Sequence, residues 1–454
     1  MSPSPNFRIR SSALTLALAL FTMASCSGND ADRLGTNSSA AADASNASGT
    51  SLSSTGGCVT SALFDSSSVH SIAVEFDVDN YAAMIAAYTA AGDKEWIEAT
   101  VTIDGETYER VGLRLKGNSS LRSVDADSDP ANLPWLVRLD KFVDDQTHDG
   151  VRDVVVRSNS SETAINEAVA LELLEAAGLA SQDAIATRFS VNGSTEVLRL
   201  VIELPGDEWM EQRFSATGAL YKADSAGDYS YRGDDPEAYN DVFEQEAGED
   251  NADLTPLIEF LEFINESDDE TFAAELSDHL DVDSFATYLA MQDLLGNFDD
   301  IDGPGNNSYL FYDTDTEQFT IVPWDYNLSF GVGPLRRPGF DPGEMPEGFD
   351  PGEMPEGFDP REMPEGFPGG AGPGGGMPVG GSNVLVERFL ENAKFNALYE
   401  AKIEDLTTGL IESGVAQEVL DRWVELLEEE AADLVDTSTI ASEAAQIETQ
   451  LSAS

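Results

Sequence analysis

A nine-residue repeat in the last third of the chain sets the strongest limit on how this sequence can fold. The segment 342–350 (PGEMPEGFD) recurs at 351–359 and, with two changes, at 360–368, and a Gly/Pro-rich stretch follows to residue 381. Regularly spaced proline breaks helices and is excluded from central strands. We therefore expect residues 336–382 to be an insertion, either a loop or an arm for binding and assembly, between two parts of a folded domain.

The first 25 residues are typical of a targeting signal. Arg8 and Arg10 precede the apolar run 13–21, which is too short to span a bilayer comfortably. The run ends in residues 23–26 (MASC), which resemble a bacterial lipobox with Met in place of the usual Leu. The resemblance implies a signal peptide cleaved before Cys26, and an exported lipoprotein anchored in a membrane of the cell envelope, at the periplasm or the cell surface. The alternative is an ordinary secretory signal.

The segment that follows predicts a disordered tether. Residues 26–57 are mostly Ser, Ala, Asn, Gly and Thr, and so few large apolar side chains cannot offset the entropy lost on ordering. If Cys26 is lipidated, Cys58 has no partner in the chain, which excludes a disulfide framework. The net charge of −61, from 85 acidic and 24 basic residues, repels nucleic acid, so we expect no nucleic-acid partner.

The remaining sequence predicts an α+β domain. Strand patterns dominate its first half, with hairpin turns at residues 104–105 and 192–193 and further strands at 134–139 and 151–157. A helix is expected over 161–174, and helical periodicity dominates after residue 257. A last hairpin spans 308–322. We therefore expect a core at 58–335 that is rich in strands first and helices later, with residues 383–454 adding helices to its C-terminal part.

The densest polar cluster lies at 296–307, between a predicted helix and a predicted strand. Asp302 and Asn307 have the five-residue spacing of a kinase catalytic loop, and Asp325 follows the last hairpin, where a kinase places its metal-binding carboxylate. The spacing alone has little specificity in so acidic a chain. A calcium loop is the local alternative, because Asp299, Asp300, Asp302 and Asn306 are hard oxygen ligands beside glycines, although no Glu closes an EF-hand.

The sequence resembles the CotH kinase family over residues 70–333. The segments that carry the resemblance are, in order, 114–120 (RLKGNSS), 191–193 (VNG) leading to Glu203, 218–222 (GALYK), 296–299 (GNFD), 307–312 (NSYLFY) and 323–326 (PWDY). The resemblance implies an atypical, exported protein kinase with a two-lobed fold, a β-rich N-lobe and a mainly helical C-lobe. It implies ATP and Mg²⁺ or Mn²⁺ as cofactors, with Asn307 and Asp325 as metal ligands.

The resemblance leaves the catalytic carboxylate open among Asp299, Asp300 and Asp302. Kinase spacing favours Asp302, with Asp300 as second choice.

The expected nucleotide site is less well defined, because a glycine-rich loop of ordinary kinase pattern is missing. Lys116 and the backbone after it stand where such a loop is expected. Arg138 lies on the strand that should carry a phosphate-contacting Lys, and Glu162 or Glu167 on the following helix is its expected partner. Glu203 is a candidate at the hinge and Lys222 a candidate phosphate contact.

Three functions are compatible with these patterns. The first is a kinase that transfers phosphate from ATP to Ser/Thr-type hydroxyls of envelope or surface proteins. The second is a non-catalytic lipoprotein that uses the same fold for adhesion or coat assembly, and the third is a calcium-binding surface protein. The presence of Asp302, Asn307 and Asp325 together favours the kinase, because a degenerate pseudokinase is expected to lack one of them.

Overall fold

The structure, a computed structural model, describes most of the chain from residue 61 onward. Cys26 and Cys58, the signal peptide, the tether, the repeat segment and Asp302 lie outside the described residues. No helix of the described part is long and apolar enough to span a membrane. The described residues are 61–214, 216–224, 228–248, 253–297, 299–301, 307–332 and 383–453.

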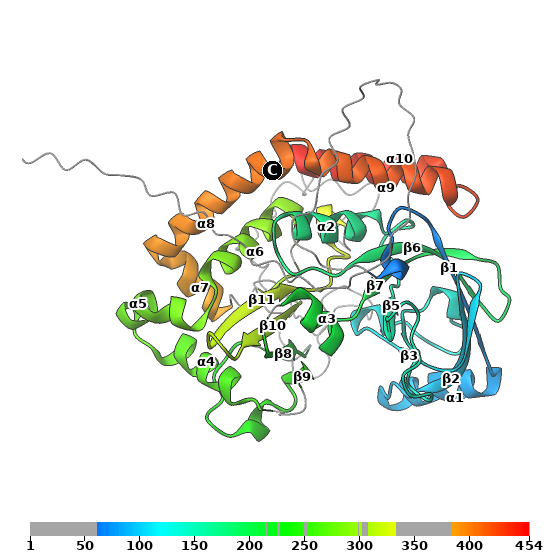
Figure 1. Cartoon of the computed structure of the whole chain (residues 1–454), viewed down its shortest axis with the longest axis horizontal. Coiled ribbons are helices and arrows are strands. Elements are labelled where there is room, and N and C mark those ends of the chain that lie inside the picture. Colours follow the sequence, from blue (N-terminus) through cyan, green and yellow to red (C-terminus); the bar gives the residue numbers. More distant parts are fainter. Residues whose placement is uncertain are drawn as a thin grey trace, which may run out of the picture. The chain divides into compact units, whose positions relative to one another are not determined.

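The first half of the domain forms a closed seven-stranded barrel (Figure 1). Its hairpin between β2 and β3 turns through Asp104 and Gly105, both with positive φ, as the sequence predicted from the Asp-Gly pair. Parallel pairing of β1 with β6 closes the barrel, and apolar side chains from all its strands fill the interior. In barrel order the strands are β1 (His70–Phe76), β2 (Ile97–Ile103), β3 (Glu106–Leu115), β4 (Trp135–Arg138), β5 (Asp153–Val156), β7 (Val197–Glu203) and β6 (Ala184–Val191).

A second sheet of four antiparallel strands follows the barrel in sequence, after the short helix α3 (Asp207–Arg213). Its central strand β10 pairs with β11 on one side and with β8 on the other, so two segments distant in sequence meet there. This sheet carries the last predicted hairpin. Its strands are β11 (Gln318–Pro323), β10 (Ser308–Asp313), β8 (Gly218–Ala223) and β9 (Phe243–Ala247).

Helices make up most of the C-terminal part. Asp and Asn side chains accept hydrogen bonds from the first backbone N–H groups of several of them, as Asp281 does for α6, and these caps set where the helices begin. The helices other than α1 share one apolar core with the four-stranded sheet, and the buried residues of α1 belong to the core of the barrel. The helices are α1 (Val78–Ala91), α2 (Ile165–Ala176), α4 (Thr255–Glu266), α5 (Asp269–His279), α6 (Val282–Leu295), α7 (Val384–Glu391), α8 (Ala393–Leu406), α9 (Val415–Glu430) and α10 (Thr437–Ala453).

The α+β class, with strands first and helices later, is therefore confirmed. Two details differ from the sequence prediction. Helix α2 begins at Ile165 rather than at residue 161, because Ala164 adopts a left-handed conformation (φ 54°). Barrel closure was not predicted, since the pairing of β1 with β6 joins segments far apart in sequence.

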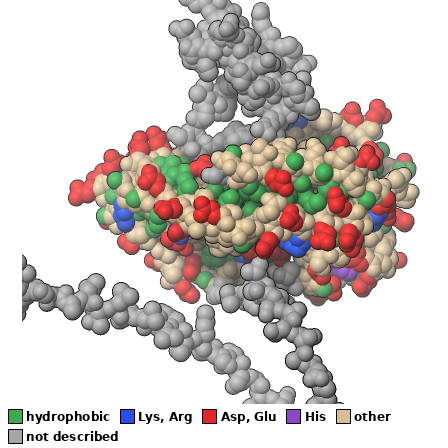
Figure 2. Space-filling model, turned by 90° about the horizontal axis from the view of Figure 1, so that it is seen from above, with side chains coloured by type: hydrophobic (Ala, Val, Ile, Leu, Met, Phe, Trp, Pro, Cys, Tyr) green, Lys and Arg blue, Asp and Glu red, His purple; other side chains and the backbone are tan. Residues whose placement is uncertain are grey.

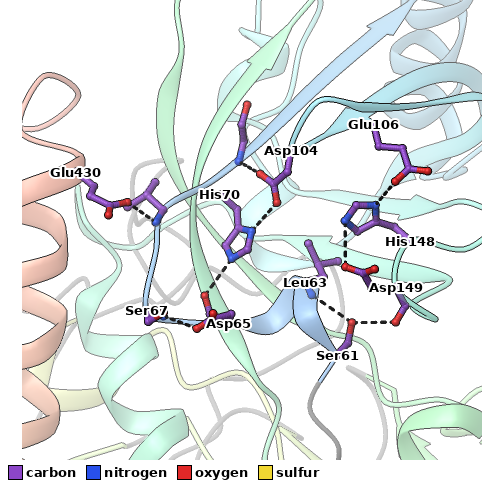
Figure 3. A network of polar contacts seen from close by, with 12 residues as sticks. Ser61, Leu63, Asp65, Ser67, His70, Asp104, Glu106, His148, Asp149 and Glu430 are labelled. Atoms are coloured by element: carbon purple, nitrogen blue, oxygen red, sulfur yellow. Dashed lines mark hydrogen bonds and ion pairs between the residues drawn. The ribbon is translucent and has the colours of Figure 1, made fainter. Parts of the chain in front are cut away.

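A polar network fixes the first described residues to the barrel (Figure 3). The two ring nitrogens of His70 lie 2.7 Å from the Asp104 carboxylate and 3.0 Å from the Asp65 carbonyl oxygen. The Ser61 hydroxyl donates to the carbonyl oxygen of Asp149. The Glu430 carboxylate at the end of α9 accepts a hydrogen bond from the backbone N–H of Val69. The network thus joins the start of the domain to its C-terminal helices.

Acidic side chains are spread over the face of the molecule seen in Figure 2, with few Lys or Arg between them. This distribution agrees with the large negative charge of the sequence.

Candidate active site

The centre of the candidate site is a buried ion pair between the barrel and α2. Arg157 directly follows β5, and its Nε donates to Glu167 Oε2 at 3.0 Å while its Nη2 lies 2.9 Å from Oε1. The Glu167 side chain, in the first turn of α2, is only 1% exposed. The same guanidinium also pairs with the carboxylate of Asp325. Burial alone would lower the pKa of Arg157, but these two carboxylates outweigh it and raise the pKa.

Asp325 is held in place from several sides. It follows β11 and has a φ of 66°, a left-handed conformation that a non-glycine residue adopts at some energetic cost. Gln182 donates to the carbonyl oxygen of Pro323 at 3.1 Å, and Asn166 of α2 donates to that of Asn327 at 2.8 Å. These contacts fix the backbone on both sides of Asp325 and join it to the helix that carries Glu167.

Asn307 brings Asp299 into the same site. Its side-chain amide donates to the Asp299 carboxylate at 3.0 Å and to the Asp299 carbonyl oxygen at 2.6 Å. Burial raises the pKa of Asp299 to about 6, and the negative charge of Asp325 adds to the rise. Asp299, Asn307 and Asp325 therefore form one cluster of oxygen-bearing side chains, of which the sequence had singled out the last two as metal ligands.

Asp300 has different neighbours. Burial raises the pKa of the Tyr288 and Tyr326 hydroxyls, and the Asp300 carboxylate adds to both rises. The Asp299 carboxylate accepts a hydrogen bond from Asn307, and the charge of Asp325 adds to the rise of its pKa. The role of catalytic carboxylate, for which Asp300 was the second choice from sequence, stays a prediction for both residues. Asp302, the first choice, stays a prediction.

The cluster suits a hard divalent cation. Two carboxylates and an amide are the ligand types that Mg²⁺ takes from proteins, which leave its other positions to water and phosphate. Burial, and next the charge of Asp325, disfavour the ionised form of Asp299, and a cation held there would favour it. Within the described ranges, no group of three or more His, Cys, Asp or Glu side chains is arranged to hold a metal alone.

Two lysines were predicted from sequence as phosphate contacts. Lys116 follows β3, with its Nζ 6.0 Å from the ring centre of Trp324, and Lys222 on β8 has its Nζ 5.3 Å from that of Tyr309. Burial lowers the pKa of Lys222 to about 8; the Asp325 carboxylate opposes this fall and Lys116 adds to it. The structure thus brings the two predicted phosphate contacts close together, where their like charges favour an anion between them.

A cavity of about 780 Å³ is lined mainly by residues of the barrel and of α3, and neither lysine is among them. Arg138 and Glu203, the other two predicted nucleotide contacts, both line it, together with Asp153 and Glu246. Burial raises the pKa of Glu246 and the charge of Lys116 opposes the rise, so Glu246 connects the cavity to the lysine pair. Burial also raises the pKa of Asp153 to about 6, although Arg138 opposes it. The cavity is large enough for a nucleotide-sized ligand.

Arg138 and Glu203, the two predicted nucleotide contacts that line the cavity, both have protein partners. The Arg138 Nε donates to the Asp140 carboxylate at 2.8 Å, so Arg138 is not the cation that pairs with α2; Arg157 is. The Glu203 carboxylate accepts from Arg213 at 2.7 Å and from the backbone N–H of Asp183 at 2.9 Å. Glu203 therefore joins β7 to α3 at the cavity wall.

Two comparisons relate the chain to known proteins. The chain is similar to the inner spore coat protein H of Bacillus subtilis (strain 168), with 24% identity over 196 residues that cover 42% of this chain and 53% of that protein. The matched segment thus spans about half the length of that relative. A family model described as CotH kinase protein matches residues 113–453. This range includes Arg157 and Glu167 as well as Asp299, Asn307 and Asp325. The match covers more than half of the chain, which therefore belongs to the CotH kinase family.

Proposed function

We propose that this chain is an ATP-dependent protein kinase that phosphorylates Ser/Thr-type hydroxyls of envelope or surface proteins. The observation that carries the proposal is the Arg157 guanidinium, which joins Glu167 of α2 to Asp325 beside the Asp299–Asn307 pair. Protein kinases pair a strand cation with a helix glutamate and hold their metal with an Asp and an Asn. In this proposal the barrel is the N-lobe and the helical part is the C-lobe.

Each part of the site then has a chemical role. The nucleotide occupies the cavity beside Glu203, with its phosphates between Lys116 and Lys222. Asn307 and Asp325 hold Mg²⁺ or Mn²⁺, which when bound offsets charge on the phosphates. Asp299 orients the acceptor hydroxyl and takes its proton, as the catalytic-loop Asp of kinases does. We assign this role to Asp299 in place of Asp302 or Asp300.

Arginine at position 157 has a role that differs from that of the lysine in an ordinary kinase. A guanidinium is always charged and binds a carboxylate through two parallel N–H groups, whereas a lysine offers a single point charge. Arg157 donates one hydrogen bond to Glu167 Oε2, has its Nη2 beside Oε1, and also pairs with Asp325. Its role is therefore to hold the two acidic residues together, and the phosphate contacts are left to Lys116 and Lys222.

A second candidate is a non-catalytic envelope protein for adhesion or coat assembly. One observation favours it: the pair with Arg157 already satisfies the Asp325 carboxylate. The relative from Bacillus subtilis is itself described as a spore coat protein. The calcium-loop candidate depends partly on Asp302 and Asn306, which lie outside the described residues.

The direct test is transfer of labelled phosphate from ATP by the purified protein with Mg²⁺ or Mn²⁺, measured as kcat/KM against pH. Asp299 accepts a proton only when deprotonated, so activity should fall as the pH drops through about 6. Lys222 holds phosphate best when charged, so activity should also fall as the pH rises through about 8. Lys222→Arg should move the alkaline limb upward, because arginine stays charged. Absence of transfer at every pH would favour the non-catalytic candidate.

We further propose that the protein is a lipoprotein anchored at Cys26, which brings it to substrates in the envelope. Cys26→Ser should prevent incorporation of labelled fatty acid and move the protein from the membrane fraction to the soluble fraction, since the attachment atom is lost. Cys58→Ser is the matched control and should leave both unchanged. A Cys26→Ser protein that stays in the membrane fraction would contradict the anchor.

A further inference from the structure

Helix α10 points three polar side chains toward the candidate site. Glu443, Gln446 and Gln450 are spaced three and then four residues apart, so they lie along one side of the helix. All three are partly buried, and Ile447 beside them is buried in the core. Each of the three lies against a different segment of the chain, and each of these segments carries a residue of the site.

Glu443 binds the segment that begins α2. One of its carboxylate oxygens accepts from the backbone N–H of Glu162 at 2.9 Å; the other accepts from the Ser161 hydroxyl at 2.9 Å and from the backbone N–H of Thr163 at 3.2 Å. The Thr163 hydroxyl also donates to it and accepts from the N–H of Ile165 at 3.1 Å. A carboxylate with four donors at a helix N-terminus is strongly held, by charge-assisted hydrogen bonds and by the helix dipole.

This contact determines where Glu167 lies. Ala164, which precedes α2, is in a left-handed conformation and provides no side-chain cap, so the start of the helix depends on the Ser161–Thr163 segment and its hold on Glu443. Glu167 follows in the first turn and pairs with Arg157. A shift at the start of α2 would therefore move Glu167, and with it the guanidinium that reaches Asp325.

The other two side chains lie against the remaining segments of the site. Gln446 donates to the carbonyl oxygen of Phe330 at 3.1 Å, and Phe330 is a buried residue with φ 59° shortly after Asp325. Gln450 packs on Gly296, since a Cβ placed there would be 2.9 Å from its amide nitrogen. Gly296 ends α6 with φ 57° and leads into the loop of Asp299.

We propose that α10 is a positioning element for phosphotransfer, in which Glu443 holds α2 so that Glu167 and Arg157 align Asp325 with Asp299. This inference rests on the proposed kinase function. Glu443 acts through other residues and contacts no substrate, so its loss should reduce the rate of transfer more than the affinity for the acceptor protein.

The test compares Glu443→Ala with Glu448→Ala. Glu448 lies on the same helix, is exposed and faces Gln417 of α9 instead of α2. Glu443→Ala should lower kcat about 10- to 100-fold, the size expected when a reacting group is misplaced, with KM for the acceptor nearly unchanged. Glu443→Gln keeps one accepting oxygen and should recover part of the loss. Glu448→Ala should behave as wild type.

A double-mutant cycle with Glu167→Gln separates positioning from general stability. If Glu443 acts through Glu167, its replacement should cost much less in the Glu167→Gln background than in wild type. If the double variant loses as much activity as the product of the two single losses, the two residues act independently and the inference is overturned. If wild type transfers no phosphate, the proposed function fails. Hydrogen exchange then tests by itself whether Glu443 holds α2 and the segment of Asp325 in position. Glu443→Ala, and not Glu448→Ala, should speed exchange at both 161–169 and 325–331; faster exchange at only the first segment would overturn it.

Discussion

Asp325→Asn is expected to abolish phosphotransfer and to weaken binding of metal-bound ATP. The amide keeps the size of the carboxylate but removes the charge that a divalent cation needs, and metal assistance is worth several kcal/mol of transition-state stabilisation, or a loss of roughly 10³-fold in rate. Folding should be nearly unaffected, because Arg157 keeps its pair with Glu167, the more buried of its two partners. Calorimetric titration with MgATP and a labelled-phosphate assay measure the two effects.

Asp313→Asn is the control for this result. Asp313 ends β10, the strand next to β11, and its carboxylate accepts from the backbone N–H of Asp315 in the hairpin turn. The same chemical change there should leave both MgATP binding and transfer intact. An Asp325→Asn protein that binds MgATP as tightly as wild type would exclude Asp325 as a metal ligand.

Asp299→Asn is expected to separate binding from chemistry. Without a carboxylate to accept the hydroxyl proton, transfer should fall by roughly 10²- to 10⁴-fold, while MgATP should still bind through Asn307 and Asp325. The melting temperature should rise at neutral pH. The folded protein raises the pKa of Asp299 to about 6, so the deprotonated carboxylate destabilises the fold above that pH, and a neutral amide removes the penalty.

Asp300→Asn is the informative comparison, because it makes the same change at the adjacent residue. Asp300 lies near the Tyr288 and Tyr326 hydroxyls, so its replacement should leave most of the transfer activity in place. Loss of transfer in Asp300→Asn or Asp302→Asn, with Asp299→Asn active, would restore the assignment made from spacing alone.

The sequence was most informative about the strands that precede candidate site residues. The apolar strand before Asp325 and the hairpin that contains it were predicted from the sequence, and the structure has them as β10 and β11. The family resemblance rests on these same segments. The match over residues 113–453 confirms that resemblance.

One residue of the candidate site, Arg157, was missed because its role depends on a contact between distant segments. Arg138 and Arg157 each lie at the end of a barrel strand, and only the packing of α2 shows that Arg157 is the one beside Glu167. The available signal was that Arg157 directly follows a strand and is the last basic residue before α2. Asp299 was ranked below Asp302 because kinase spacing was applied along the chain, whereas the turn at Gly296 and the Asn307 amide decide which carboxylate faces Asp325.

The contact between Glu443 and the start of α2 also has a consequence for the order of events during synthesis. Its partners Ser161 and Glu443 are separated by 282 residues, and the barrel closes when β1 pairs with β6, another distant segment. Contacts of such high sequence separation form late and slowly in folding. A ribosome must therefore make nearly all of the described chain before α2 can be secured, so nascent and truncated chains would lack an aligned active site.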